Sequence, residues 1–160
     1  MPRKNRTHAN PSQIATRLAE QRELWEPLIT YDAHRRYYVR LAAEPHFEAW
    51  LLTWLSGQGT EWHDHGGSAG AFAILRGALT EEIAQVRPDE PPRILPQARE
   101  LTAGSLRPFG SQHLHRVTNQ GLEPAVSLHV YAPSLVEMHE YEARGFLLYS
   151  NQSQLVGLNW

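Results

Sequence analysis

The stretch GQGTEWHDHGGSAGAFAILRG, residues 57–77, decides the fold of this 160-residue chain. It begins and ends with glycine, and a single residue separates His63 from His65. Because side chains alternate along a strand, the two imidazoles would project from one face of a strand while Asp64 points away. Two imidazoles on one face can chelate a metal ion. The pair alone would also suit a solvated strand face, so the surrounding sequence has to decide between these readings.

The surrounding sequence is typical of a β-protein. Seven short runs rich in β-branched, aromatic or aliphatic residues are separated by Gly, Pro and Asn: Tyr37–Leu41, Phe47–Leu55, Ala71–Arg76, Ala78–Val86, Ser105–Pro108, His113–Val117 and Ala125–Tyr131. Many short strands with turn signals between them favour a sandwich or a barrel. Upstream, apolar residues recur at helical spacing between Pro11 and Leu28, which predicts one or two short helices. The predicted fold is all-β with short N-terminal helices.

The glycine spacing around the histidine pair is specific. Gly57 lies six residues before His63 and Gly77 lies twelve after His65, an arrangement that resembles the first motif of the cupin proteins. About forty residues later, a second segment resembles the second cupin motif, with these residues in order: Gly104, Pro108, Gly110, His115 and Asn119. The resemblance implies a jelly-roll-like β-barrel. We expect residues 1–160 to form a single cupin domain, with a helical segment at 1–30, the barrel at about 36–135 and an extension at 136–160 packed on the barrel.

The chain departs from the first cupin motif at one informative position. Where many cupins have a metal-binding glutamate, this sequence has Gly70, which leaves a histidine set without a carboxylate. Neutral imidazoles suit iron, copper, nickel or zinc rather than magnesium or calcium. Three protein ligands also leave coordination positions open for a substrate. The third ligand is His113 when counted from Pro108 and His115 when counted from Asn119, so spacing alone leaves both open.

Two further sets of residues are candidates for a site. Ser127, His129 and Tyr131 occupy alternate positions of one predicted strand, so they share a face and can form a hydrogen-bonded row. Arg40 carries a planar guanidinium, whose two parallel donors match a carboxylate. Arg36 shares its strand face and is the alternative.

These residues together resemble the type I cysteine dioxygenase family. The similarity is carried by five segments: Tyr38-Val39-Arg40, Trp54, His63-Asp64-His65, Leu114-His115-Arg116-Val117 and Ser127-Leu128-His129-Val130-Tyr131. The resemblance selects His115 as the third ligand, with His63 and His65, of an Fe(II) ion. It implies that Tyr131 acts in catalysis with His129 and Ser127 behind it, and that Arg40 and Tyr38 bind substrate.

The resemblance also predicts an activity. It implies that L-cysteine and O2 are converted to cysteine sulfinic acid, with no organic cofactor. Animal members of the family have a cysteine that can be crosslinked to the active-site tyrosine, whereas this chain has Gly70 there, as bacterial members commonly do. The alternatives are a dioxygenase for another thiol carboxylate, such as 3-mercaptopropionate, and a metal-binding cupin without turnover. The Ala132-Pro133 segment matches one in which the family can have a cis bond.

Composition excludes several other classes of protein. The formal net charge of −2 gives no electrostatic case for nucleic acid or for a membrane surface. No apolar run approaches the roughly 20 residues that span a bilayer. The chain has no cysteine, which rules out disulfides, thiolate metal sites and a cysteine nucleophile. We expect a cytoplasmic monomer whose only partners are a small thiol and O2.

Overall fold

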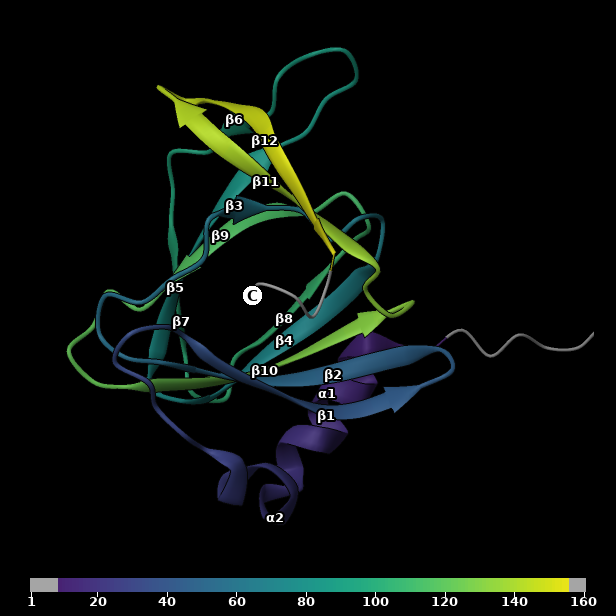
Figure 1. Ribbon diagram of the computed structural model, residues 1–160, viewed down its shortest axis with the longest axis vertical. Helices are drawn as coiled ribbons and strands as arrows, with labels where there is room; N and C mark the ends of the chain where they lie inside the picture. Colours follow the sequence, from purple (N-terminus) through teal and green to yellow (C-terminus); the bar gives the residue numbers. More distant parts are fainter. Residues whose placement is uncertain (1–8, 156–160) are drawn as a thin grey trace, which may run out of the picture.

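A computed structural model describes residues 9–155, and the ends of the predicted N-terminal segment and C-terminal extension lie outside this range. The chain folds into a closed β-barrel with short helices on its outside (Figure 1). The helices are α1 (Pro11–Glu20), α2 (Arg22–Trp25) and the 3-10 turn η1 (Glu26–Leu28). Asn10 caps α1, because its side chain accepts hydrogen bonds from the backbone N–H groups of Ser12 and Gln13.

Two sheets form the barrel wall. The first contains five strands in the order β1 (Tyr37–Glu44), β2 (Phe47–Trp54), β10 (Ala125–Ala132), β4 (Ala69–Arg76) and β8 (Leu106–Phe109). The second contains seven strands in the order β6 (Arg93–Ile94), β12 (Leu147–Leu155), β11 (Glu137–Arg144), β3 (Trp62–His63), β9 (Leu114–Thr118), β5 (Ala78–Gln85) and β7 (Arg99–Thr102). Every pairing is antiparallel.

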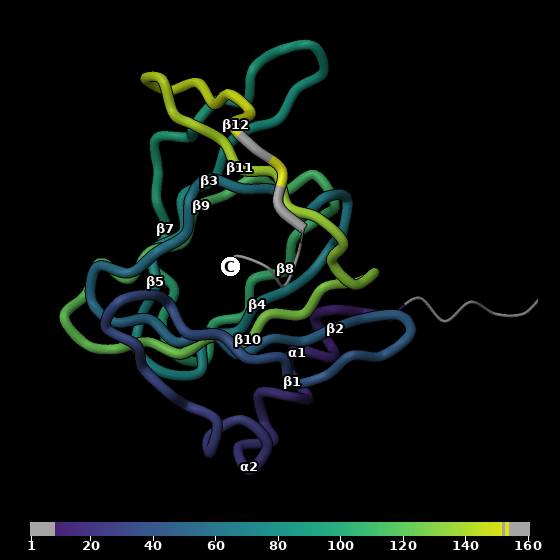
Figure 2. Tube along the Cα trace, viewed as in Figure 1, coloured from purple at the N-terminus to yellow at the C-terminus, as the bar shows by residue number. Residues whose placement is uncertain are grey.

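The predicted all-β fold is confirmed, and each of the seven predicted strands overlaps an observed one. The extension at 136–160 was expected to pack on the barrel, and no secondary structure was predicted for it. It forms the strands β11 and β12, and β11 pairs with β3 beside the metal-site candidates. In Figure 2 the same two strands run across one end of the molecule. None of the helices within residues 9–155 is long and apolar enough to cross a membrane.

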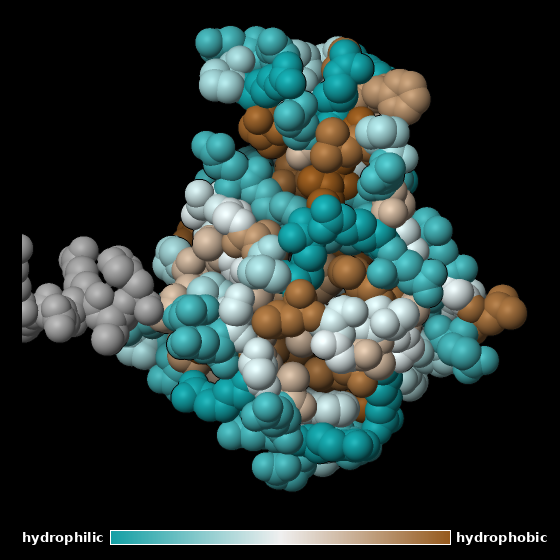
Figure 3. All heavy atoms as spheres, turned by 180° about the vertical axis from the view of Figure 1, so that it is seen from behind, coloured by the Kyte–Doolittle hydropathy of each residue, from teal (hydrophilic) through white to brown (hydrophobic). Residues whose placement is uncertain are grey.

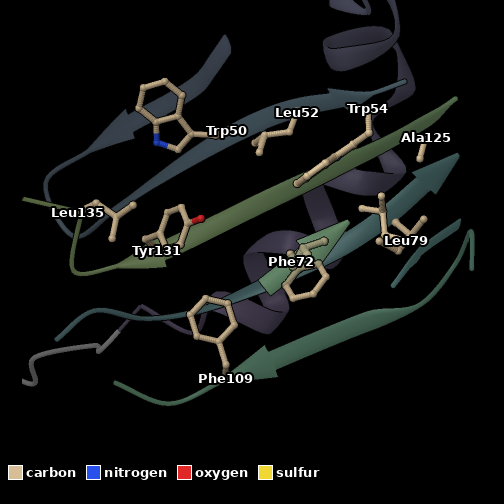
Figure 4. Close-up of a cluster of buried hydrophobic side chains, with 11 residues drawn as sticks. Trp50, Leu52, Trp54, Phe72, Leu79, Phe109, Ala125, Tyr131 and Leu135 are labelled. Atoms are coloured by element: carbon tan, nitrogen blue, oxygen red, sulfur yellow. The ribbon is translucent and has the colours of Figure 1, made fainter. Parts of the chain in front are cut away.

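Side chains alternate between the two faces of the central strands of the first sheet, and each face packs in its own hydrophobic cluster. Trp50, Leu52 and Trp54 of β2 belong to the cluster inside the barrel, as does Tyr131 of β10 (Figure 4). The intervening residues of the same strands, such as Leu128, face the helices and pack against Ile14 and Leu18 of α1. Both faces of β10 are therefore covered, which explains why this strand is buried from Ala125 to Tyr131. On the face opposite to that of Figure 1, hydrophobic residues lie in small groups between hydrophilic ones and do not cover the whole face (Figure 3).

Candidate metal centre

Three histidines from the second sheet converge inside the barrel. His63 ends β3, His65 follows it, and His115 lies on β9 directly opposite His63 in the strand register. One ring nitrogen from each residue lies within 4.8 Å of the other two. Their exposed fractions are 5%, 1% and 2%, respectively. Such a cluster of buried nitrogen ligands is the geometry that a single metal ion requires.

The hydrogen bonds of two of these rings show which nitrogens are available to a ligand. Nδ1 of His63 lies 2.9 Å from the carbonyl oxygen of Glu61, and Nδ1 of His115 lies 2.8 Å from a carboxylate oxygen of Glu81. Both partners are acceptors, so each Nδ1 carries the hydrogen. The lone pair of each Nε2 is therefore left for a metal.

Burial keeps this cluster in the form that binds metal. It lowers the pKa of His63 and His65 well below the ordinary value, and it lowers the pKa of His115 to about 4. Neighbouring imidazoles lower these pKa values further. Nδ1 of His65 is buried without a hydrogen-bond partner within the described residues. Three neutral nitrogen donors without a carboxylate fit iron, copper, nickel or zinc, and the residues present thus fit the ion that the family resemblance implies.

Asp64 points away from the cluster, as the alternation predicts. Its carboxylate accepts hydrogen bonds from the ring of His139 and the hydroxyl of Tyr141, each at 2.8 Å. These contacts attach the segment between the two histidines to β11. The β11 strand therefore helps to hold His63 and His65 in place.

A row of hydrogen-bonded side chains lies on the inner face of the first sheet. The indole N–H of Trp54 donates to the hydroxyl of Ser127 at 2.9 Å, and that hydroxyl lies 2.8 Å from Nε2 of His129. Burial lowers the pKa of His129 to about 3, so its ring is neutral. The sequence predicted the serine and histidine of this row, whereas Trp54 entered only as part of the family resemblance and was given no role. The indole donor makes Trp54 the first member of the row.

Tyr131 continues this face of the strand toward the histidines. Its side chain is 2% exposed, and its ring centroid lies 5.4 Å from that of His65. Burial raises the pKa of Tyr131 above its usual value, although the charge of Arg36 opposes the shift. The hydroxyl is therefore protonated at neutral pH and able to donate a hydrogen bond. Tyr38, the other tyrosine predicted to line the site, is partly buried and packs against the same inner cluster.

The two candidate arginines lie in different environments. Arg40 is exposed, with its guanidinium 5.7 Å from the ring of Trp50. Arg36 lies 4.8 Å from the ring of Trp54 and donates to the carbonyl oxygen of Gly59, while its buried Nε has no hydrogen-bond partner within residues 9–155. Burial lowers the pKa of Arg36 to about 10, which still leaves it charged. The predicted residue thus reaches the surface, and its alternative turns inward, where its charge acts on Tyr131 and His129.

His113, the other candidate for the third ligand, lies outside the three-histidine cluster and bonds through its ring to Glu81. Its Nε2 lies 2.9 Å from Oε1 of Glu81, and its ring stacks on Phe109. Glu81 also accepts the hydrogen bond from His115, and sequence reasoning missed it altogether. A glutamate in an alternating strand is indistinguishable from a surface residue until its neighbours are known.

Gly70, at the position of the missing glutamate and cysteine, is required by close packing. A Cβ atom there would collide with the backbone oxygen of Val130 and with the ring of Phe109. The close approach of β10 and the phenylalanine ring thus occupy the space that a side chain would need. The chain contains no cysteine with which a thioether could form.

We expect Gly70→Ala to destabilise the fold by about 1–3 kcal/mol, the range typical of inserting a methyl group into a packed interior. Urea unfolding of the two proteins would measure the change. Gly110→Ala is the matched control, because a Cβ atom at Gly110 meets nothing within 4 Å. Equal losses from both substitutions would show that the packing around Gly70 does not exclude a side chain.

Solved structures agree with the fold. A protein of Thermus thermophilus matches with a TM-score of 0.57 at 21% identity, over 68% of this chain and 93% of its own. A cupin superfamily protein of Desulfitobacterium hafniense matches with a TM-score of 0.53 at 15% identity, over 68% and 87% of the two chains. The chain therefore has the cupin fold, with three histidines pointing into the barrel.

Sequence comparisons narrow this class to one family. The family model for cysteine dioxygenase type I matches residues 8–144, and the chain belongs to that family. It is similar to cysteine dioxygenase type 1 of Bos taurus, with 28% identity over 75% of this chain and 62% of the relative. For the Rattus norvegicus protein the identity is 33%, over 61% and 50%. The chain therefore spans less than two thirds of the length of these relatives.

The cis bond between Ala132 and Pro133 is present, as the resemblance predicted.

Proposed function

We propose that this chain is an iron-dependent thiol dioxygenase that converts L-cysteine and O2 to cysteine sulfinic acid. The observation that carries the proposal is the set of three buried, neutral histidines near the half-buried guanidinium of Arg36, which has no carboxylate partner within residues 9–155 and whose Nε is buried without a hydrogen bond. His63, His65 and His115 would hold the ion. Bound there, it would supply a Lewis-acidic centre at which the thiolate and O2 meet.

The reaction balances without a further reductant. The thiol sulfur loses its proton and bonds to both oxygen atoms of O2, which gives the sulfinate, and the proton goes to a sulfinate oxygen or to solvent. The four electrons that reduce O2 come from the sulfur itself. No group other than the ion, the thiol and the protein is needed.

The protein side chains would orient the substrate and exclude water. Arg36 offers a half-buried cation that would pair with the substrate carboxylate, and it would thus fill the role that the sequence assigned to Arg40. The hydroxyl of Tyr131 would donate a hydrogen bond to the substrate or to the oxygen atoms. Trp54, Ser127 and His129 form the hydrogen-bonded row on the same inner face.

Oxygen uptake by the Fe(II)-loaded protein with a panel of thiols tests this function. L-cysteine should be the best substrate, 3-mercaptopropionate weaker and cysteamine poor, because cysteamine has no carboxylate to pair with the guanidinium of Arg36. Metal binding with no oxygen uptake for any thiol would favour a cupin without turnover. Equal rates with cysteine and cysteamine would show that Arg36 does not bind the substrate carboxylate.

A further inference from the structure

Glu81 is a carboxylate with no exposed surface in the wall of the barrel. Its side chain extends from β5 and is 0% exposed. Burying a charged group is costly unless it is paired and hydrogen-bonded. Burial alone would raise the pKa of Glu81, but hydrogen bonds from His113, His115 and Arg107 outweigh it and hold the pKa well below its usual range. The residue is therefore an anion with three donors around it.

The contacts divide between the two oxygen atoms of the carboxylate. Oε2 accepts from the guanidinium of Arg107 at 2.8 Å. Oε1 accepts from His115 at 2.8 Å and from His113 at 2.9 Å. Arg107 thus fixes Oε2. Oε1 accepts from Nδ1 of His115, whose other ring nitrogen, Nε2, faces His63 and His65.

From this geometry we propose that Glu81 is the positioning residue for His115, with Arg107 and His113 holding the carboxylate in place. The inference rests on the proposed metal site. A carboxylate that accepts from Nδ1–H fixes both the tautomer and the ring orientation of a metal-ligating histidine. Of the three histidines of the centre, His115 is the one that bonds to a carboxylate; His63 has a backbone carbonyl instead.

A second cation at the cluster of Glu81, His113 and His115 is the competing interpretation of these contacts. Ligand atoms of the three residues lie within 4.8 Å of one another. However, the guanidinium of Arg107 already pairs with Glu81, and its positive charge would repel a divalent ion. Hydrogen bonding within the protein accounts for every one of the contacts.

The test measures metal affinity in the absence of substrate. Fe(II) under anaerobic conditions, and Co(II) as a spectroscopic probe, would be titrated into the full chain in competition with a chelator. Glu81→Gln should weaken binding by about tenfold, and Glu81→Ala should approach about a hundredfold, the range known for outer partners of metal ligands. Glutamine loses less because its amide retains one acceptor oxygen.

Glu82→Gln is the matched control. Glu82 is the next residue of β5 and forms an ion pair with Arg116 of β9, and within residues 9–155 it has no hydrogen bond or ion pair with any of the three histidines. It should leave the affinity unchanged. Arg107→Gln, at a partly exposed side chain, should weaken binding in the same direction as Glu81→Gln even if the variants of Glu81 fold poorly.

A merely structural role for Glu81 predicts a different pattern. The metal-free protein would melt at a lower temperature, while the affinity of the folded fraction and the Co(II) absorption spectrum would match those of the wild type. Affinities of Glu81→Gln and Arg107→Gln equal to that of Glu82→Gln would overturn the inference. A wild type that binds neither ion would count against the proposed function instead, so the two failures are distinguishable.

Discussion

Replacing His115 with alanine should abolish stable iron binding and thiol oxidation together. Removing a direct ligand costs more than the roughly 10–100-fold associated with an outer partner, so the fall in kcat/KM should exceed a hundredfold. The ring also lies between Glu81 and the other two histidines, and its loss leaves the buried carboxylate with one donor fewer. Iron content after anaerobic loading and desalting, together with oxygen uptake, would measure both effects.

His46→Ala is the control for this substitution. His46 lies in the exposed turn between β1 and β2, and the variant should bind iron and oxidise thiols as the wild type does. His113→Ala gives a second comparison, because His113 was the other candidate for the third ligand. If His113→Ala lost all iron while His115→Ala kept it, the assignment of the ligands would be wrong.

Substitution of Arg36 should produce the second large effect. A charge-assisted hydrogen bond to a substrate is worth about 1.5–3 kcal/mol, so Arg36→Met should lower kcat/KM for L-cysteine by about tenfold to a hundredfold. Arg40→Met should change it little, because the Arg40 side chain lies at the surface over Trp50. Cysteamine oxidation should be nearly unaffected by either substitution, since cysteamine has no carboxylate.

Stability separates a binding role of Arg36 from a structural one. The guanidinium of Arg36 donates to the carbonyl oxygen of Gly59, so Arg36→Met should lower the free energy of unfolding by no more than about 0.5–1.5 kcal/mol, the net worth of one hydrogen bond. If Arg40→Met lost cysteine turnover and Arg36→Met retained it, Arg40 would be the residue that binds the substrate carboxylate, as the sequence predicted. Equal losses for cysteine and cysteamine in Arg36→Met would make that arginine structural.

The fold and the ligand cluster could be predicted from sequence because both depend on local patterns. A strand period of two places His63 and His65 on one side of the chain, and glycines at fixed distances mark the turns that bring the strands together. The row on β10 follows from the same period. The structure then brings His115 opposite His63 through the pairing of β3 with β9.

The remaining parts of the site depend on contacts that no local pattern contains. Alternation along a strand would place Arg36 and Arg40 on one face, but Arg36 precedes the first residue of β1, and the two side chains differ in depth. Glu81 resembles any polar residue of an alternating strand until Arg107, His113 and His115 surround it. The strands of the C-terminal extension could not be predicted for the same reason. The sequence of β11 is polar, and its position is fixed by pairing with β3 and β12.

Isotope labelling of the product tests the central claim most directly. Fe(II)-loaded protein would be given L-cysteine under dioxygen made of the heavy isotope of oxygen, and the product would be analysed by mass spectrometry. The account predicts cysteine sulfinic acid that carries both labelled atoms, formed in equal amount to the dioxygen consumed. Cystine as the sole product, or sulfinic acid whose oxygen comes from water, would contradict it.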